Sequence, residues 1–179
     1  MRRPDLVADC ASCAAICCIA TSFDASEDFA FAKPAGVACA NLTRDCRCAI
    51  HDELAVHGFA GCAVYDCHGA GPRVTRAFAG VADRGQPRDA AFRILRVVHE
   101  LLWLLTEAVK LGPPGELAAQ LAAEIAGLDA IAGGPIHALV DVDLRAVDAA
   151  ARALLRRVGT ALGGRRPVAR VLPLVRSPR

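Results

Sequence analysis

Aromatic residues are scarce in this chain of 179 residues, in which Phe, Trp and Tyr together make up 4%. A hydrophobic core must therefore be built mainly from Leu, Val, Ile and Ala. Long apolar runs are missing as well, because the longest, residues 14–20 and 101–105, would each form two helical turns or fewer. A membrane-spanning helix needs about 20 apolar residues, so we expect no membrane span.

We also expect no signal peptide of the usual form. Pro4, Asp5 and Asp9 interrupt the segment after Met1-Arg2-Arg3 that would have to be apolar. We therefore expect a cytoplasmic protein. In a reducing cytoplasm, clustered cysteines are more often metal ligands or catalytic thiols than disulfides.

Several catalytic signatures are absent. No phosphate loop of the form G-x-x-x-x-G-K-[ST] occurs, and no serine stands in a nucleophile elbow. His99-Glu100 begins like the zinc motif H-E-x-x-H, but Trp103 replaces the second histidine. Whether the protein is an enzyme stays open, and a redox or metal-dependent enzyme is one alternative.

What the sequence does contain is a concentration of nine cysteines, all between Cys10 and Cys67. Residues 1–80 carry nine acidic and seven basic residues, whereas residues 81–179 carry ten acidic and 14 basic residues and no cysteine. We therefore predict a cysteine-rich metal-binding module over residues 1–80, a three-helix bundle over 81–164 and a basic tail over 165–179.

Apolar residues recur every three or four positions in the second part, which indicates amphipathic helices. We predict helices over about residues 89–111 and 116–131 and a third that begins after Asp143, a plausible N-cap. Short loops between them favour antiparallel packing. The predicted fold is mainly α, an irregular cysteine-rich module packed on a three-helix antiparallel bundle.

The C-terminal end is strongly basic, with eight arginines and no acidic residue from Arg152 onward. A solvated helix face followed by a loose tail is the simpler interpretation. The alternative is an adaptor that binds nucleic acid or a protein through this end, although no aromatic residue is interleaved to stack on bases.

The first four cysteines follow the pattern C-x2-C-x3-C-C. If this segment is helical, Cys10, Cys13 and Cys17 lie on one face, and Asp9 stands at the helix N-terminus. Convergent sulfurs of this kind suit a tetrahedral zinc ion, which binds thiolates at about 2.3 Å. Metal chelation is favoured over two alternatives, a set of buried thiols that act as small hydrophobes and a disulfide scaffold.

The order of the cysteines resembles a known family. Cys39-Ala-Asn-Leu42, Cys48-Ala-Ile-His51 and the final pair Cys62 and Cys67 follow the first four as in the CxxCxxxCC-type zinc- or iron-chelating domain family. The resemblance spans about residues 8–70. It implies that the metal ligands are the eight cysteines at the family positions, Cys10, Cys13, Cys17, Cys18, Cys39, Cys48, Cys62 and Cys67.

A narrower resemblance is to the front domain of certain actinobacterial pentapeptide-repeat proteins, through Lys33-Pro34-Ala35-Gly36 and Gly58-Phe59-Ala60-Gly61-Cys62. The repeat solenoid itself is missing, because only residues 40–44 fit the repeat. Cys46 lies outside the eight family positions and is taken as a bystander.

The identity and number of the metal ions stay open. Zinc is favoured because it accepts four thiolates without redox chemistry, and iron or an iron–sulfur cluster is the alternative. Eight cysteines can serve two four-sulfur sites or one site with spares. His51, His57 and His68 are expected to be surface residues or neighbours of the ligands rather than ligands.

Overall fold

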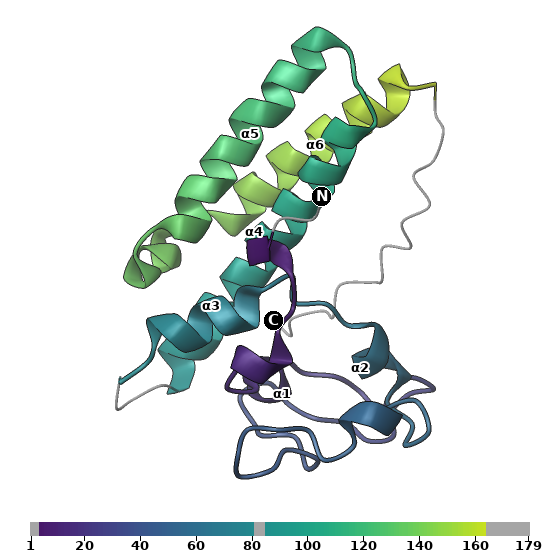
Figure 1. Cartoon of the computed structure of the whole chain (residues 1–179), viewed down its shortest axis with the longest axis vertical. Helices are drawn as coiled ribbons and strands as arrows, with labels where there is room; N and C mark the ends of the chain where they lie inside the picture. The colour runs from purple at the N-terminus through teal and green to yellow at the C-terminus, as the bar shows by residue number, and fades with distance from the viewer. Residues whose placement is uncertain (1–3, 81–84, 164–179) are drawn as a thin grey trace. The chain divides into compact units, whose positions relative to one another are not determined.

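The computed structural model describes residues 4–80 and 85–163 and confirms a mainly α-helical fold (Figure 1). The α-helices are α1 (Ile16–Ala20), α2 (Ala60–Val64), α3 (Ala70–Ala77), α4 (Gly85–Lys110), α5 (Gly115–Gly133) and α6 (Leu144–Ala161). Short 3-10 helices are η1 (Pro4–Leu6), η2 (Cys10–Ser12), η3 (His51–Glu53) and η4 (Ile136–Asp141). In these residues β-pairing is limited to isolated bridges, such as that between Phe23 and Lys33.

The chain divides into two compact units, and the boundary lies inside α4, after Arg93. The described part of the first unit is residues 4–80 and 85–93, and that of the second is residues 94–163. The expected boundary was near residue 80. The first turns of α4 belong to the cysteine-rich unit, where Asp89 and Phe92 are buried. The predicted basic tail, residues 165–179, lies outside the described residues.

Helix α4 begins at Gly85, four residues before the predicted start. Pro87 is compatible with this start, because the N–H groups of a first helical turn have no partner within the helix. The predicted apolar stripe is fully buried at Leu95, Val98, Leu102 and Leu105. Val109, which was expected to continue the stripe, is exposed, so the stripe ends one turn early.

Helices α5 and α6 lie side by side and run in opposite directions (Figure 1). A hydrogen bond of 2.7 Å from the Arg157 guanidinium to the Gln120 side-chain oxygen joins them. Arg152 of α6 bonds Asp148 at 2.7 Å and lies 3.8 Å from Glu100 of α4. The antiparallel arrangement expected from the short loops is thus present in the second unit.

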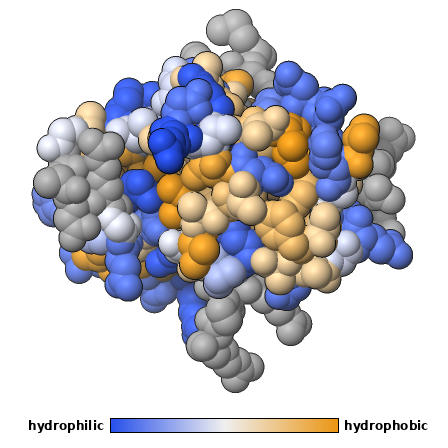
Figure 2. All heavy atoms as spheres, turned by 90° about the horizontal axis from the view of Figure 1, so that it is seen from below, coloured by the Kyte–Doolittle hydropathy of each residue, from blue (hydrophilic) through white to orange (hydrophobic). Residues whose placement is uncertain are grey.

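The first unit is irregular, and α3 is its central element. Both α1 and η2 contact α3, and Ile16, Ala20, Ala70 and Val74 are buried. The face seen in Figure 2 gathers hydrophobic side chains between hydrophilic ones. Across the described residues, no helix combines the length and apolar character that crossing a membrane requires.

The predicted N-cap of the third bundle helix is confirmed. The Asp143 carboxylate accepts hydrogen bonds of 3.1 Å from the backbone N–H groups of Arg145 and Ala146. We expect Asp143→Ala to lower the free energy of unfolding by about 1 kcal/mol, because these N–H groups lose their acceptor. Urea unfolding measures the difference. Asp141→Ala, which removes an exposed carboxylate nearby, should change it by much less, and equal effects would argue against the cap.

Candidate metal centre

The segment that carries the first cysteines is not one continuous helix, which was the condition for Cys10, Cys13 and Cys17 to share a face. It forms the 3-10 helix η2, capped by the Asp9 carboxylate, and then the separate helix α1. Between them, Ala15 has left-handed backbone dihedrals, with φ 53° and ψ 39°, which interrupt any right-handed helix. Cys10 and Cys13 therefore approach α3 from η2, whereas Cys17 approaches it from α1.

The sulfurs of Cys13 and Cys67 lie around the same point of α3. That point is Gly71, where a Cβ atom would stand 2.8 Å from the Cys13 sulfur and 3.7 Å from the Cys67 sulfur. The Thr75 hydroxyl, one turn further along α3, accepts a hydrogen bond of 2.9 Å from the Ala14 N–H and donates to the Cys13 sulfur at 3.8 Å. Glycine is needed at position 71 because a side chain would enter the space between the two sulfurs.

Cys10 and Cys17 belong to the same neighbourhood. Burial raises the pKa of the Cys10 thiol, and the charges of Cys67 and Cys13 raise it further. A hydrogen bond with Cys18 raises the pKa of Cys17 most, and burial and the charges of Cys18, Cys13 and Cys67 raise it further. We call Cys10, Cys13, Cys17 and Cys67 the first thiol group.

Backbone N–H groups are directed at Cys67. Burial raises the pKa of this thiol, while hydrogen bonds from the N–H groups of Gly71 and Gly69 to its sulfur lower it. The turn is made by His68 at φ 48° and Gly69 at φ 80°. Such hydrogen bonds favour the thiolate, which is the form that binds metal.

A second set of thiols interacts with Cys18, the residue that follows Cys17. The backbone N–H of Cys39 donates to the carbonyl of Cys18 at 2.9 Å. Cys48 interacts electrostatically with Cys18 and Cys39. Burial, followed by the charges of Cys18, Cys39 and Cys48, raises the pKa of Cys62 to about 11. We call Cys18, Cys39, Cys48 and Cys62 the second thiol group.

An aromatic cluster holds the helix that carries Cys62. The rings of Phe23 and Phe29 stack with centroids 4.4 Å apart, and the edge of Phe31 meets Phe59 at 4.9 Å. The Phe29 ring covers Gly61, where any side chain would overlap it. The Gly61 N–H also donates to the Asp28 carbonyl, so α2 is fixed against residues 23–31.

Lys33 is a buried cation beside the second thiol group, with 4% of its surface exposed. Its ammonium group donates to the carbonyls of Ile19 (3.2 Å), Pro34 (3.2 Å) and Val37 (2.9 Å), and also to that of Thr21. Burial lowers the pKa of Lys33, whereas the charges of Cys39, Cys18 and Cys17 raise it. The lysine therefore ties the end of α1 to the segment that leads to Cys39.

The two thiol groups are connected through adjacent residues, Cys17 in the first group and Cys18 in the second. A hydrogen bond links the Cys17 and Cys18 side chains, and it raises the pKa of Cys17 and lowers that of Cys18. Lys33 and His51 lower the pKa of Cys18 further.

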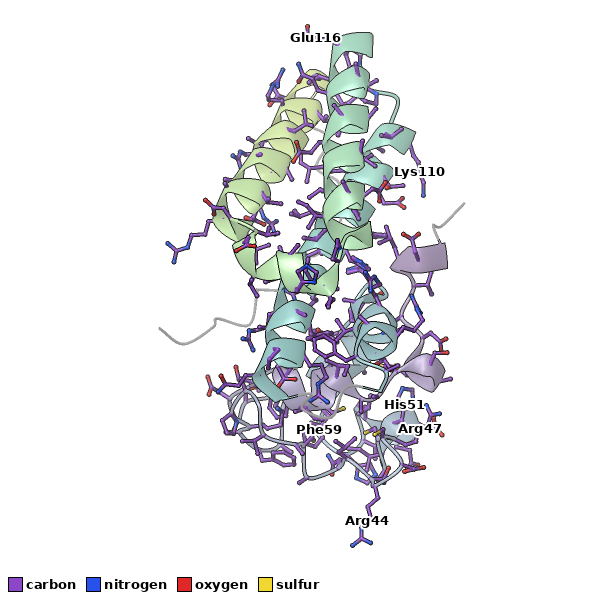
Figure 3. All side chains as sticks on the ribbon, turned by 90° about the vertical axis from the view of Figure 1, so that its left-hand side faces the viewer. Arg44, Arg47, His51, Phe59, Lys110 and Glu116 are labelled. Carbon is purple, nitrogen blue, oxygen red and sulfur yellow. The ribbon has the colours of Figure 1, made fainter. Side chains whose placement is uncertain are left out.

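A second connection joins the first cysteine segment to the loop before Cys48. The Arg47 guanidinium donates to the carbonyls of Cys10 at 2.7 Å and Ala11 at 3.1 Å. Arg44, in the same loop, extends away from the rest of the unit (Figure 3).

The remaining candidates are Cys46 and the three histidines of the first unit. All nine cysteines are free thiols, and Cys46 is exposed with φ 61°. His51 and His57 are exposed and lie 3.4 and 3.5 Å from Asp52 and Glu53, respectively. His68 is largely buried and lies 3.9 Å from Asp66.

The thiols are grouped, but they are not at the spacing of bound ligands. Among the residues described, no three Cys, His, Asp or Glu side chains are close enough together to hold a metal ion. The donor chemistry does fit a thiolate-binding metal, because Cys67 and Cys48 accept backbone N–H hydrogen bonds and Gly71 keeps space free between two sulfurs. Metal binding requires the sulfurs of each set to move closer together.

Several residues that arrange the thiols carry no recognisable sequence signal. Lys33 and Gly71 stand in the sequence as an ordinary lysine before a turn and an ordinary glycine. Thr75 is not distinguished from other polar helix residues. Arg47 could be noticed only because it lies between Cys46 and Cys48.

Comparison with known proteins adds one relative and no family. No protein-family model and no solved structure matches the chain. Among curated proteins, the chain is 41% identical over 113 residues to "Uncharacterized protein YybG" of Bacillus subtilis (strain 168). The matched part is 60% of this chain and 40% of that protein, so the chain spans less than half the length of this relative.

We expect Lys33→Met to loosen the second thiol group, because the carbonyls around the ammonium lose a charged donor worth about 2–3 kcal/mol. The amides of Gly36 and Cys39, which bond the carbonyls of Ile19 and Cys18, should then exchange hydrogen roughly 30- to 150-fold faster. Hydrogen-exchange mass spectrometry of residues 33–39 measures this.

The matched control is Lys110→Met, at the chain's other lysine, which is exposed and bonds Glu107 at 2.6 Å. It should leave exchange in residues 33–39 unchanged. If Lys33→Met also leaves it unchanged, the ammonium does not hold this segment.

Proposed function

We propose that this chain is a metal-binding protein whose cysteine-rich unit binds metal, with zinc favoured, in a largely structural role. The observation that carries the proposal is the convergence of the thiols. Each of eight cysteines, from six places in the sequence, interacts electrostatically with at least one other of the eight, and they are the eight that match the CxxCxxxCC-type pattern. The ligands we propose are Cys10, Cys13, Cys17, Cys18, Cys39, Cys48, Cys62 and Cys67.

A structural role is supported by the composition of the two cores. Among the described residues, the largest fully buried side chains of the first unit are Phe92, Ile16 and Val74, and the others lie in the second unit. A small unit with so few buried apolar groups gains little from the hydrophobic effect. Metal–thiolate bonds would supply the missing stability, as they do in small zinc domains.

The donor set is compatible with both zinc and iron. Four thiolates suit tetrahedral zinc, which would act as a redox-inert crosslink, and the same donors suit an iron–sulfur cluster. Elemental analysis and an absorption spectrum of protein purified without oxygen distinguish the two. A colourless zinc protein is the expected result.

The other predictions have less support. In the described part of the basic end, Arg152 pairs with Asp148 and Arg157 bonds Gln120, so these arginines serve the bundle itself. No observation favours nucleic-acid binding over this role. The association with pentapeptide repeats, a protein partner, catalysis and a cytoplasmic location remain predictions.

We expect a strong chelator, under reducing conditions without oxygen, to loosen the first unit. Amides between residues 10 and 67 should lose protection from hydrogen exchange, because the metal no longer links their segments. Amides of the buried bundle positions, such as Leu121 and Val158, should stay protected. Hydrogen-exchange mass spectrometry with and without chelator measures this.

Returning zinc to the stripped protein should restore the protection of residues 10–67. A protein purified without metal, whose exchange responds neither to the chelator nor to added zinc or iron, would contradict the proposed function.

A further inference from the structure

We propose that Cys13 and Cys67 form a redox-active pair. A low-molecular-weight disulfide, such as oxidised glutathione, converts this pair to an intramolecular disulfide when no metal ion holds the two sulfurs. The pairing itself rests on geometry. Its consequence for metal binding rests on the proposed function, because both residues are among the eight proposed ligands and a closed disulfide removes two donors at once.

The two sulfurs lie near the same point of α3. A Cβ atom at Gly71 would stand 2.8 Å from the Cys13 sulfur and 3.7 Å from the Cys67 sulfur, so both sulfurs are within 4 Å of one position. Because residue 71 is a glycine, no side chain separates them. In the described part of the chain, no third Cys, His, Asp or Glu joins them closely enough to hold a metal ion. Two sulfurs over an open space, without a third donor, are the arrangement from which a disulfide forms.

Helix α3 positions the backbone of both residues. On one side, η2 contacts α3, and the Ala14 N–H donates to the Thr75 hydroxyl at 2.9 Å. The same hydroxyl donates to the Cys13 sulfur at 3.8 Å. On the other side, the carbonyl of Cys67 accepts the N–H of Ala70, the first residue of α3, at 3.0 Å. Since both segments are tied to one helix, side-chain rotation brings the sulfurs to the bonding distance of about 2.05 Å.

The adjacent thiols of Cys17 and Cys18 are less suited to an internal disulfide. The Cα atoms of neighbouring residues are about 3.8 Å apart, closer than the roughly 4.4 Å that a relaxed disulfide requires. Cys13 and Cys67 come from segments that are far apart in the sequence, so this limit does not apply to them. Both side chains are partly exposed, which gives a small reagent access to them.

The reaction is a thiol–disulfide exchange in two steps. One cysteine of the pair, as its thiolate, attacks a sulfur of oxidised glutathione, whose S–S bond breaks and releases one glutathione thiolate. The second cysteine, also as its thiolate, attacks the sulfur of the first, which breaks the mixed disulfide and releases the second glutathione. Two protein thiols are oxidised, one glutathione disulfide is reduced to two thiols, and the two cysteine protons end on the two glutathione molecules.

The test is a disulfide map of the full chain, stripped of metal without oxygen and then incubated with oxidised glutathione. Mass spectrometry of the linked peptides should identify Cys13–Cys67 as the main disulfide, and the number of free thiols should fall from nine to seven. Cys46→Ser, which removes an exposed thiol, should form the same disulfide. In concentrated urea the preference for this pair should disappear, because the fold aligns the two sulfurs. A main product that links other cysteines, or mixed disulfides alone, overturns the pairing.

A glycine variant tests the geometry with every thiol present. Gly71→Ala places a methyl group 2.8 Å from the Cys13 sulfur and should slow the closure of the disulfide about tenfold or more. Gly127→Ala in α5, where a Cβ meets open space, should leave the rate unchanged. Equal rates in the two variants would contradict closure over Gly71.

The disulfide should also replace the metal as a crosslink. A covalent bond traps the arrangement of η2 on α3 even in a unit that is loosened by removal of its metal. After oxidation, the Ala14 amide, which bonds Thr75, should therefore regain protection from hydrogen exchange. An Ala14 amide that exchanges equally fast before and after closure would contradict this arrangement.

The outcomes separate this inference from the proposed function. Zn²⁺ added before the oxidant should slow closure about tenfold or more, because bound zinc occupies both sulfurs. A chain that binds no metal but closes the Cys13–Cys67 disulfide overturns the proposed function and supports the pairing. A chain that binds metal, but whose stripped form does not close this disulfide, overturns the pairing and leaves metal binding intact. Because the map of the wild-type chain decides, a variant that fails to fold does not prevent a decision.

Discussion

Thiolates packed into a small volume repel one another, and the cysteine-rich unit is organised around this constraint. Burial and neighbouring sulfurs raise the pKa values of Cys10, Cys48, Cys62 and Cys67, so the free thiolates are disfavoured where they stand. A metal cation would remove this penalty for all of them together, because metal binding takes the deprotonated sulfur.

The protein offsets part of the thiolate charge with its own groups. Backbone N–H groups serve Cys67 and Cys48, and the ammonium of Lys33 lies beside Cys18 and Cys39. Four carbonyl groups hold this ammonium in place, which makes it a fixed rather than a mobile charge. Hydrogen bonds and a positive charge of this kind tune a thiolate site without binding the metal themselves.

The helical part of the fold could be predicted from the sequence because its information is local. The apolar period located α4, α5 and α6, and Asp143 was identified as a cap from its residue type and position. The thiol groups depend on non-local geometry. The left-handed residue Ala15 broke the helix that the Cys10–Cys17 spacing suggested, and no local pattern indicates that an alanine adopts this conformation.

The same distinction explains which site residues were missed. The eight cysteines could be recognised from their order, but Gly71, Thr75 and Lys33 act through contacts with segments up to 62 residues away. Residue type alone also cannot show that a lysine is buried, since lysine is almost always exposed. The chain thus combines a bundle that apolar periodicity predicted with a unit whose cysteine order could be recognised but whose contacts could not.

X-ray absorption at the metal edge tests the central claim most directly, because it reports the atoms bonded to the metal in the full chain purified without oxygen. The account predicts a first shell of four sulfur atoms per metal at about 2.3 Å, with no contribution from nitrogen or oxygen. A chain that carries no metal, or a metal whose first shell is mainly oxygen and nitrogen, would contradict it.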